Sequence, residues 1–366
     1  MKKIILSLLL VQNIVFCTMT AKSCSAFMLK GKDCCVVGFN ENDKKSLPGL
    51  ILTNKRGVTK EGLSWNQLVS NEKVNEPKIT WTSRYGSVSF NLLGIDMPCY
   101  GVNEKGLFIV ELFLDKTYST NIEGRANLWW GQWIQYQLDN YASVDEVLNA
   151  LDSAPVIDWW PNYPGSHFFL CDKTGKTAAI ELIDGKYVVS ANDKMPVPAL
   201  CNGQYQEELK NLQQYKGFGG TIDFNINSQR WEDRFCKAAH LVNNYKEAQS
   251  AYNPVDYSWK VLNDIFPGIW QFVYDVNNGV LQFRSDRGQG IKELNMSEID
   301  YSNETPIMYL DIHADFSGKA FPHFSTFTPE INKEYVIKGF NLGADNPKFI
   351  TLQKNIDDYV RTTYKL

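Results

Sequence analysis

Short motifs that mark common catalytic and cofactor sites are absent from this sequence. It has no Gly-x-Ser-x-Gly elbow, no His-Glu-x-x-His pair, no Gly-x-x-x-x-Gly-Lys-Ser/Thr loop and no spaced-glycine dinucleotide fingerprint. There is no Cys-x-x-Cys pair, and only four histidines are present. His167 and His240 lie in an apolar strand and a helical stretch, which favours structural roles. We therefore expect no metal and no cofactor.

Long apolar runs are also scarce, and the clearest one is N-terminal. Residues 4–16 are mostly apolar, but this run is shorter than the ~20 residues that span a bilayer. Two lysines precede it, and Ala21 and Ser23 follow it, in the order of a secretory signal peptide. We predict that residues 1–23 are removed and that an exported protein, periplasmic or extracellular, begins at Cys24.

A lipoprotein is the alternative interpretation of this N-terminus, with Cys17 or Cys24 lipidated. The bulky Phe16 and the lack of a leucine three residues before Cys24 disfavour it. Later segments are not apolar enough to span a membrane. The formal net charge is −4 and basic runs are lacking, so nucleic acid is not expected as a partner.

Aromatic residues are abundant, at 13% of the chain with ten Trp, and they suit both a core and a pocket for a bulky apolar ligand. No repeat, linker or composition shift divides the chain. We predict one domain over residues 24–366, with a C-terminal extension from about residue 312. Eight cysteines show no disulfide framework, and most are interpreted as small buried apolar residues.

Strand-like and helix-like patterns are mixed along the chain. Apolar and β-branched stretches predict strands over residues 25–29, 34–40, 49–57, 78–93 and 106–114. Apolar residues at helical spacing predict helices over residues 126–142, 143–151, 204–215 and 228–245. A hairpin around Asn278-Gly279 is predicted inside residues 269–286.

Cys24 is the strongest candidate for chemistry. A cysteine at a free N-terminus carries both a nucleophilic thiol and, in its α-amine, a proton acceptor with a reference pKa of about 7.7–8.0. Such a centre does not require a histidine. It does require fixed N–H donors where the oxygen of the tetrahedral intermediate forms.

Several ordered segments carry a resemblance that covers Cys24 to about Asp311. They include CSAFML, LTNKRGV, WTSRYGSVSFN, GVNEKGL, WIQYQLDN, MPVPALCNGQY, DRFCKAA and WQFVYDVNNGVLQFRS. Together they resemble the choloylglycine hydrolase and penicillin V acylase family, linear amide C–N hydrolases of the N-terminal-nucleophile type. The resemblance implies an α+β fold, specifically a four-layer αββα sandwich. Because relatives are often tetramers, it also implies a homotetramer.

The resemblance also implies a set of site residues. Cys24 matches the nucleophile, and Asn202 matches the asparagine whose amide donates to the oxyanion. Phe113 matches the residue whose backbone N–H is the second donor, and Arg234 matches the arginine that supports the charge network. Asn103 matches a turn residue outside the site.

One segment departs from the family. Its pattern is Gly-Arg-Asn-x-Asp, with the arginine near the sulfur and the aspartate on the α-amine, whereas this chain has GFNEN at residues 38–42. Phe39 replaces the arginine and Asn42 replaces the aspartate. A one-residue shift places Asn40 and Asp43 there instead, still without the arginine that favours a thiolate.

Two functions follow. The first is a cysteine-dependent hydrolase of linear amides, with conjugated bile acids, N-acyl amino acids and penicillin V-like acyl amides as substrate candidates. Its acyl pocket is predicted near Trp81, Phe39, Phe113 and the DWWPNY loop at residues 158–163. The second is a catalytically impaired, exported protein that binds a bulky apolar acid or amide. A Cys24 held in a disulfide is the structural alternative.

Overall fold

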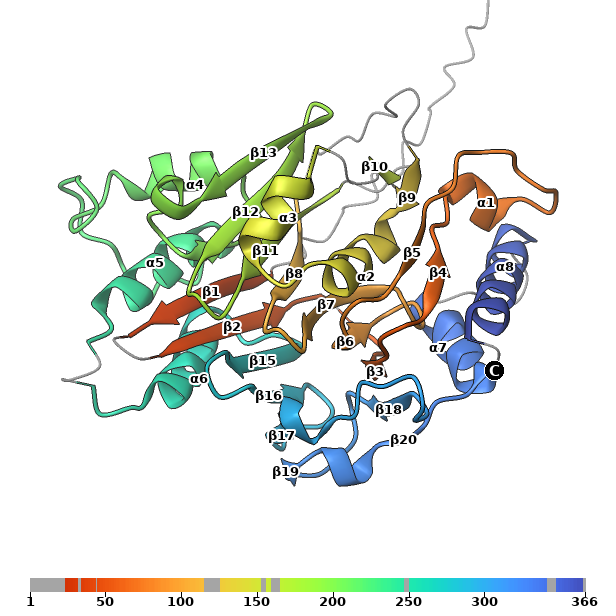
Figure 1. Cartoon of the computed structure of the whole chain (residues 1–366). Helices are drawn as coiled ribbons and strands as arrows, with labels where there is room; N and C mark the ends of the chain where they lie inside the picture. The colour runs from red at the N-terminus through yellow and green to blue at the C-terminus, as the bar shows by residue number, and fades with distance from the viewer. Residues whose placement is uncertain are drawn as a thin grey trace, which may run out of the picture.

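Two large sheets stacked face to face form the centre of the molecule. The computed structural model describes residues 24–31, 34–43, 45–114, 126–152, 156–158, 165–246, 250–340 and 347–364 (Figure 1). The first sheet has the order β14 (Ala199–Leu200), β1 (Ser25–Lys30), β2 (Cys35–Glu41), β15 (Trp270–Asp275), β16 (Val280–Ser285), β17 (Lys292–Asn295) and β19 (Gly318–Lys319). Its strands are antiparallel apart from the β17–β19 pair.

The second sheet is antiparallel throughout. Its order is β13 (Lys186–Ala191), β12 (Thr177–Ile183), β11 (Ser166–Cys171), β8 (Phe108–Phe113), β7 (Pro98–Asn103), β6 (Ser87–Asn91), β3 (Leu50–Asn54), β18 (Met308–Asp311) and β20 (Ser325–Thr326). Two small pairs join β4 (Thr59–Glu61) to β5 (Thr80–Thr82) and β9 (Asn127–Trp129) to β10 (Val156–Asp158).

Helices cover the outer faces of both sheets (Figure 1). Helices α5 (Arg234–Asn244) and α6 (Pro254–Ile265) contact the first sheet at β1, β2 and β15, with α4 (Tyr205–Leu212) beside α5. Helix α2 (Trp130–Asn140) contacts β7 and β8 of the second sheet. The remaining helices are α1 (Trp65–Val69), α3 (Val144–Ala150), α7 (Pro329–Phe340) and α8 (Pro347–Tyr364). The predicted αββα sandwich of the α+β class is confirmed.

Aromatic rings fill the space between the sheets. Phe39 of β2 packs against Tyr100 of β7 with ring centroids 5.4 Å apart, and Phe90 of β6 meets Phe272 of β15 at 4.7 Å. Because β1 and β2 are covered on both faces, their residues are buried almost without a break. The strand that starts after Cys24 is therefore held rigidly in the middle of the sandwich.

Most predicted elements are present, with shifted ends. The hairpin at Asn278-Gly279 is confirmed, and Gly279 takes the left-handed φ of 65° that this turn needs. The predicted helix over residues 228–245 begins only at Arg234, after a 3₁₀ turn. Helix α6 was not predicted, although Asn253 caps it and Pro254 opens it.

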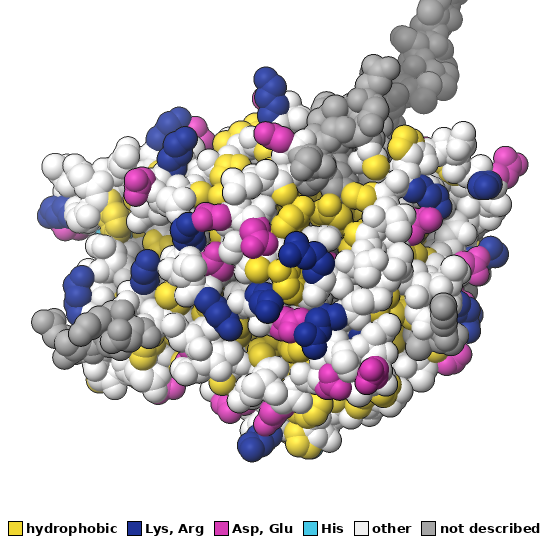
Figure 2. All heavy atoms as spheres, in the orientation of Figure 1, with side chains coloured by type: hydrophobic (Ala, Val, Ile, Leu, Met, Phe, Trp, Pro, Cys, Tyr) yellow, Lys and Arg dark blue, Asp and Glu magenta, His cyan; other side chains and the backbone are white. Residues whose placement is uncertain are grey.

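Charged side chains show no segregation by sign on the face in Figure 2. Basic and acidic groups are interspersed there, with apolar patches between them. None of the described helices is long and apolar enough to cross a membrane.

Candidate active site

Cys24 lies directly before β1 and is 2% exposed. In the β1–β2 hairpin, Ser25 faces Asn40, so the register continued by one residue brings Cys24 opposite Glu41. The Cys24 Sγ donates to the Glu41 Oε1 over 3.4 Å. Glu41 itself is 7% exposed. The residue beside the predicted nucleophile is therefore an acid.

A small cavity of about 30 Å³ adjoins Cys24, with room for about one water molecule. Its walls come from both sheets and from α2, and most are apolar. The lining residues are Cys24, Glu41, Leu47, Leu92, Cys99, Glu111, Phe113, Trp130 and Trp270. The Ser166 hydroxyl donates to the Glu111 carboxylate. The cavity thus combines two thiols, two carboxylates and an aromatic wall.

Arg234 connects the predicted nucleophile to the predicted oxyanion donor. One terminal nitrogen of its guanidinium donates to the Cys24 carbonyl at 2.5 Å and to the Ser25 hydroxyl at 3.1 Å. The other donates to the Asn202 Oδ1 at 2.8 Å. Arg234 is 2% exposed, so its charge acts where solvent screening is weak. This contact with the Asn202 oxygen also orients its amide nitrogen.

Asn202 and Phe113, both predicted site residues, are hydrogen-bonded to each other. The Asn202 Nδ2 donates to the Phe113 carbonyl at 2.6 Å. In the β8–β11 ladder, Leu114 N donates to the Gly165 carbonyl, which makes these two residues a hydrogen-bonded pair. Because such pairs alternate with non-hydrogen-bonded ones, the adjacent pair of Phe113 and Ser166 exchanges no backbone hydrogen bond. The peptide groups of Phe113 therefore point away from β11, toward the side that Asn202 approaches.

His167 has the structural position that its sequence context favoured. Its Nε2 lies 2.7 Å from the Cys201 carbonyl, and its Nδ1 lies 3.2 Å from Glu181. Glu181 also accepts from the backbone N–H of Tyr205. This buried chain holds the peptide just before Asn202. The described residues contain no group of three or more His, Cys, Asp or Glu that could hold a metal.

Titratable groups near Arg234 are shifted by burial. Burial raises the pKa of Glu208 to about 7, against the charge of Arg234, which lowers it. Burial raises the pKa of Cys201 to about 11 and that of Cys236 to about 12. Both thiols therefore stay protonated at neutral pH, which agrees with their interpretation as small buried residues.

Phe39 and Asn40 do not occupy the places predicted for them. Phe39 packs between Tyr100 and Phe272 in the core, away from the cavity lining. Asn40 points to the helical face, where its amide donates to the carbonyls of Leu262 and Phe266. Asn40 lies on the opposite face of β2 from Glu41, whereas Phe39 shares the face of Glu41 but stands opposite Ala26. The position opposite Cys24 belongs to Glu41.

The other predicted residues are not among the described lining residues of the Cys24 cavity. Asn42 is buried and Asp43 half-buried, directly after β2. Trp81 packs in the outer layer, where its indole donates to Asp139 at 2.7 Å and its ring meets Tyr136, so it is not a wall of the Cys24 cavity. Residues 159–164, most of the predicted aromatic loop, lie outside the described residues. The predicted turn role of Asn103 is confirmed by its bonds to the N–H groups of residues 105 and 107.

Glu41, Glu111 and Trp270 were not predicted as site residues. Glu41 stands inside the quoted GFNEN segment. The alternation of side chains along a strand could have indicated it, because Glu41 lies two residues after buried Phe39 and therefore on the same strand face. Glu111 is a carboxylate in an otherwise apolar strand, FIVELF. Trp270 opens β15, directly opposite Glu41 in the sheet.

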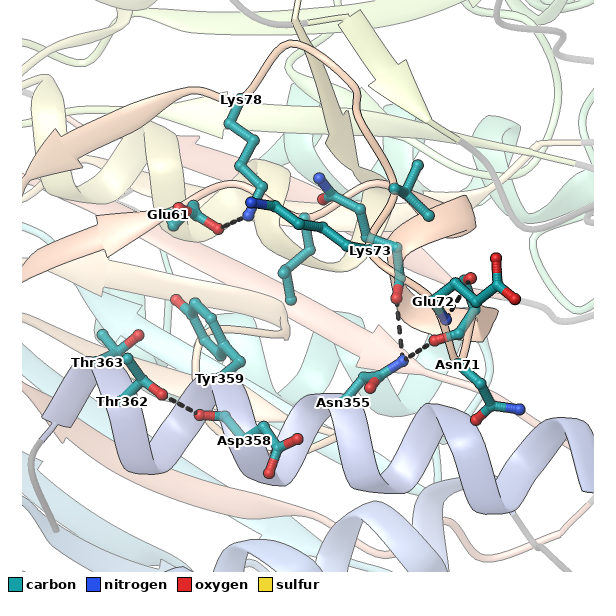
Figure 3. A pocket seen from close by; sticks show the side chains of 14 residues that line it. Glu61, Asn71, Glu72, Lys73, Lys78, Asn355, Asp358, Tyr359, Thr362 and Thr363 are labelled. Atoms are coloured by element: carbon teal, nitrogen blue, oxygen red, sulfur yellow. Dashed lines mark hydrogen bonds and ion pairs between the residues drawn. The ribbon is translucent and has the colours of Figure 1, made fainter.

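A larger cavity, of about 360 Å³, lies far from this chemistry (Figure 3). It separates α8 from the segment after α1, and charged groups of both signs line it, including the Lys78–Glu61 pair. The Asn355 amide donates to the carbonyls of Gln67, Leu68 and Ser70 at its base. These bonds are typical of a structural junction.

Comparison with known proteins identifies the family. Residues 65–266, more than half of the chain, match the model for linear amide C–N hydrolases of the choloylglycine hydrolase family. The chain belongs to this family. The matched region includes Phe113, Asn202 and Arg234 but begins after the hairpin that carries Cys24 and Glu41.

Two curated family members show the relationship at the level of sequence. The penicillin V acylase of Pectobacterium atrosepticum is 32% identical over 180 residues, covering 45% of this chain and 47% of that protein. The bile salt hydrolase/transferase of Clostridium perfringens is 31% identical over 146 residues, covering 37% and 44%. The chain thus spans about half the length of the curated relatives it matches.

Solved structures support the fold over a longer span. The penicillin V acylase of Agrobacterium tumefaciens superposes with a TM-score of 0.71 at 23% identity, covering 83% of this chain and 98% of that one. A mutant of the conjugated bile acid hydrolase from Clostridium perfringens gives 0.61 at 18% identity, covering 83% and 96%.

Proposed function

We propose that this chain is a cysteine-dependent hydrolase of linear, non-peptide amides, with Cys24 as its nucleophile. The supporting observation is the chain of bonds in which Arg234 links the Cys24 carbonyl to Asn202, while Asn202 reaches Phe113. Residues from β1, the end of β14, β8 and α5 converge there. Membership of the family supports amide hydrolysis as the reaction type.

The proposed reaction has two stages. The Cys24 sulfur attacks the amide carbonyl carbon, and the thiol proton passes to a base, for which the α-amine of a processed Cys24 is the family's expected group. The Asn202 amide and the Phe113 N–H stabilise the oxyanion. The C–N bond breaks as the leaving nitrogen takes the proton. Water then hydrolyses the thioester, releasing the acid and restoring the thiol.

The substrate classes to test come from the family. The cavity has room for only about one water molecule, so its apolar and aromatic walls describe the surface next to Cys24 and not a whole acyl site. Conjugated bile acids, penicillin V-like acyl amides and N-acyl amino acids are the classes to test. Export and removal of residues 1–23 belong to the same proposal, and so does a homotetramer.

Turnover of an amide panel by the chain purified after export tests this function. Its intact mass should show that it begins at Cys24, and amine release should be lost in Cys24→Ser. Cys34→Ser, at a cysteine outside the cavity lining, is the matched control and should retain activity. Size-exclusion chromatography with light scattering tests the tetramer.

The second candidate function is a binding protein for an apolar acid or amide. The acid beside the thiol, together with Phe39 in place of the family arginine, favours it. Calorimetric binding of a hydrolysis product that is equal in the parent and Cys24→Ser, without turnover by either protein, would establish this candidate instead.

A further inference from the structure

The contact between Cys24 and Glu41 reverses the charge expected at a family nucleophile. The Glu41 Oε1 lies 3.4 Å from the Cys24 Sγ, and both side chains are at least nine-tenths buried. The two residues are cross-strand neighbours in a rigid hairpin, so the contact is set by the register of β1 and β2. It does not depend on a flexible loop.

A second carboxylate lines the cavity beside this pair. Glu111 on β8, Cys99 on β7 and Trp270 on β15 line the same cavity, with no Lys or Arg among its described lining residues. Tyr100 of β7 is buried, with Glu41 close enough to raise its pKa further. Arg234 of α5 reaches the Cys24 carbonyl and the Asn202 oxygen by its terminal nitrogens. The pair therefore lies in a weakly screened site beside a second carboxylate, with the Arg234 guanidinium bonded to the Cys24 carbonyl.

We propose that Glu41 is the catalytic base that takes the thiol proton of Cys24. This inference rests on the proposed function. It assigns the acceptance of the thiol proton to Glu41 in place of the α-amine of Cys24. As Sγ bonds to the amide carbonyl carbon, the S–H proton moves to Glu41 Oε1. When the C–N bond breaks, Glu41 returns that proton to the leaving nitrogen. The pair carries one negative charge before attack, and the oxyanion carries it afterwards.

Physical chemistry favours this transfer over a resting thiolate. A buried carboxylate at this distance opposes a second negative charge on sulfur, so the ground state is a thiol hydrogen-bonded to a carboxylate. An arginine at this place would stabilise the thiolate instead. With Glu41 at this place, the thiol is deprotonated by general-base catalysis during attack and is not held beforehand as a thiolate. General-base catalysis typically contributes about 10²–10⁴-fold to a rate.

Glu41→Gln separates this role from a passive one, because two readouts should move in opposite directions. The experiment uses the whole chain as it is purified after export. The ultraviolet thiolate signal of Cys24 is the absorbance difference between the protein with Cys24 and its Cys24→Ser variant. Its titration midpoint should fall by about one to three units in Glu41→Gln, because a like charge is gone. The kcat for amide hydrolysis should nevertheless fall by about 10²–10⁴-fold, because the base is gone. Glu111→Gln is the matched control and should move both readouts less.

Three results would overturn the proposal. They are an unchanged thiol midpoint, a kcat that rises with the thiolate population, and an equal effect of Glu111→Gln. If Glu41→Gln fails to fold, Glu41→Asp is the second variant, because it keeps the carboxylate charge but moves it away from the thiol. Its kcat should fall, and the titration midpoint of the Cys24 thiol should fall less than is expected for Glu41→Gln. Failure of the proposed function is distinct: the parent would then hydrolyse no amide, or would do so no faster than Cys24→Ser, whatever the midpoint of the thiol.

Discussion

At the scale of single residues, Arg234 connects more of the site than any other side chain described. Its guanidinium contacts the Cys24 backbone, the neighbouring Ser25 and the Asn202 amide from one buried position. A planar fork with several donors suits such divergent acceptors, whereas an ammonium group does not. The position of Asn202 relative to Cys24 should therefore depend on this fork.

Replacement of Arg234 by lysine tests this dependence. Arg234→Lys keeps the charge but loses the fork, so we expect about 2–3 kcal/mol lower stability from the lost charged hydrogen bonds. We expect kcat to fall roughly 100-fold, because the oxyanion donor loses its orientation. Urea unfolding and amide hydrolysis measure the two effects. Arg230→Lys, whose side chain is 72% exposed, should change stability by less than about 0.5 kcal/mol.

Trp270 offers a residue-scale test of substrate contact. Its indole N–H is buried and has no hydrogen-bond partner among the described residues, although its ring lines the Cys24 cavity. Such groups are rare unless a ligand or water completes them. Trp270→Phe should raise KM by about tenfold, the loss of one hydrogen bond, with a smaller change in kcat.

Trp133→Phe controls for the loss of ring volume in this experiment. Its indole N–H is also buried without a described partner, but Trp133 belongs to the outer core cluster, which excludes Cys24. Its KM should not change. Equal KM effects in the two variants would refute a direct contact between Trp270 and the substrate.

At the scale of elements, strand parity shows how far the sequence could predict the site. The strands of the β1–β2 hairpin, Cys24 and Arg234 were all accessible from sequence pattern or resemblance. The neighbour of the thiol was not, because it depends on hairpin register, and one residue of slip exchanges the two faces of a strand. Matching letters to the family pattern selected Phe39, which stands opposite Ala26, and Asn40, which lies on the other face, whereas the hairpin register places Glu41 opposite Cys24.

A charge placed at Phe39 tests this register. Phe39→Arg restores the family's letter but would bury a guanidinium between Tyr100 and Phe272. We expect a loss of more than about 4 kcal/mol, enough to unfold many domains. Phe39→Leu should cost about 1–3 kcal/mol and remain folded. A stable, more active Phe39→Arg in thermal melts and hydrolysis assays would show that the sequence register is right.

Helix α4 carries a carboxylate whose ionisation should be visible in the pH dependence of stability. Burial raises the pKa of Glu208 to about 7, above its ordinary value near 4.5. Between these values the folded protein binds the proton more tightly than the unfolded chain, so this group's contribution to stability falls as pH rises from about 4.5 to 7. Glu208→Gln should be about 1–3 kcal/mol more stable relative to the parent at pH 8 than at pH 4. Equal differences at both pH values in urea unfolding would contradict this sign.

At the scale of the whole molecule, the C-terminal helices join the outer layer of the sandwich. Tyr359 and Tyr364 of α8 donate to the buried Asp96 carboxylate, which also binds Lys60 of β4. Asn355 adds its bonds to the carbonyls that end α1. These contacts join residues nearly 300 positions apart, which explains why local sequence pattern could not predict them.

A single hydroxyl tests whether this extension unfolds together with the sandwich. Tyr359→Phe removes one donor to Asp96, so we expect about 1–3 kcal/mol lower stability. If both core clusters form one cooperative unit, fluorescence and circular dichroism should report the same single transition. The kcat of the proposed amide hydrolysis should stay unchanged in the folded variant, since Tyr359 is outside the cluster that contains Cys24. Thr362→Ala, on the exposed side of α8, should change stability by less than about 0.5 kcal/mol. Two separated transitions would instead show that α8 unfolds before the sheets, and its removal would then leave the Cys24 site intact.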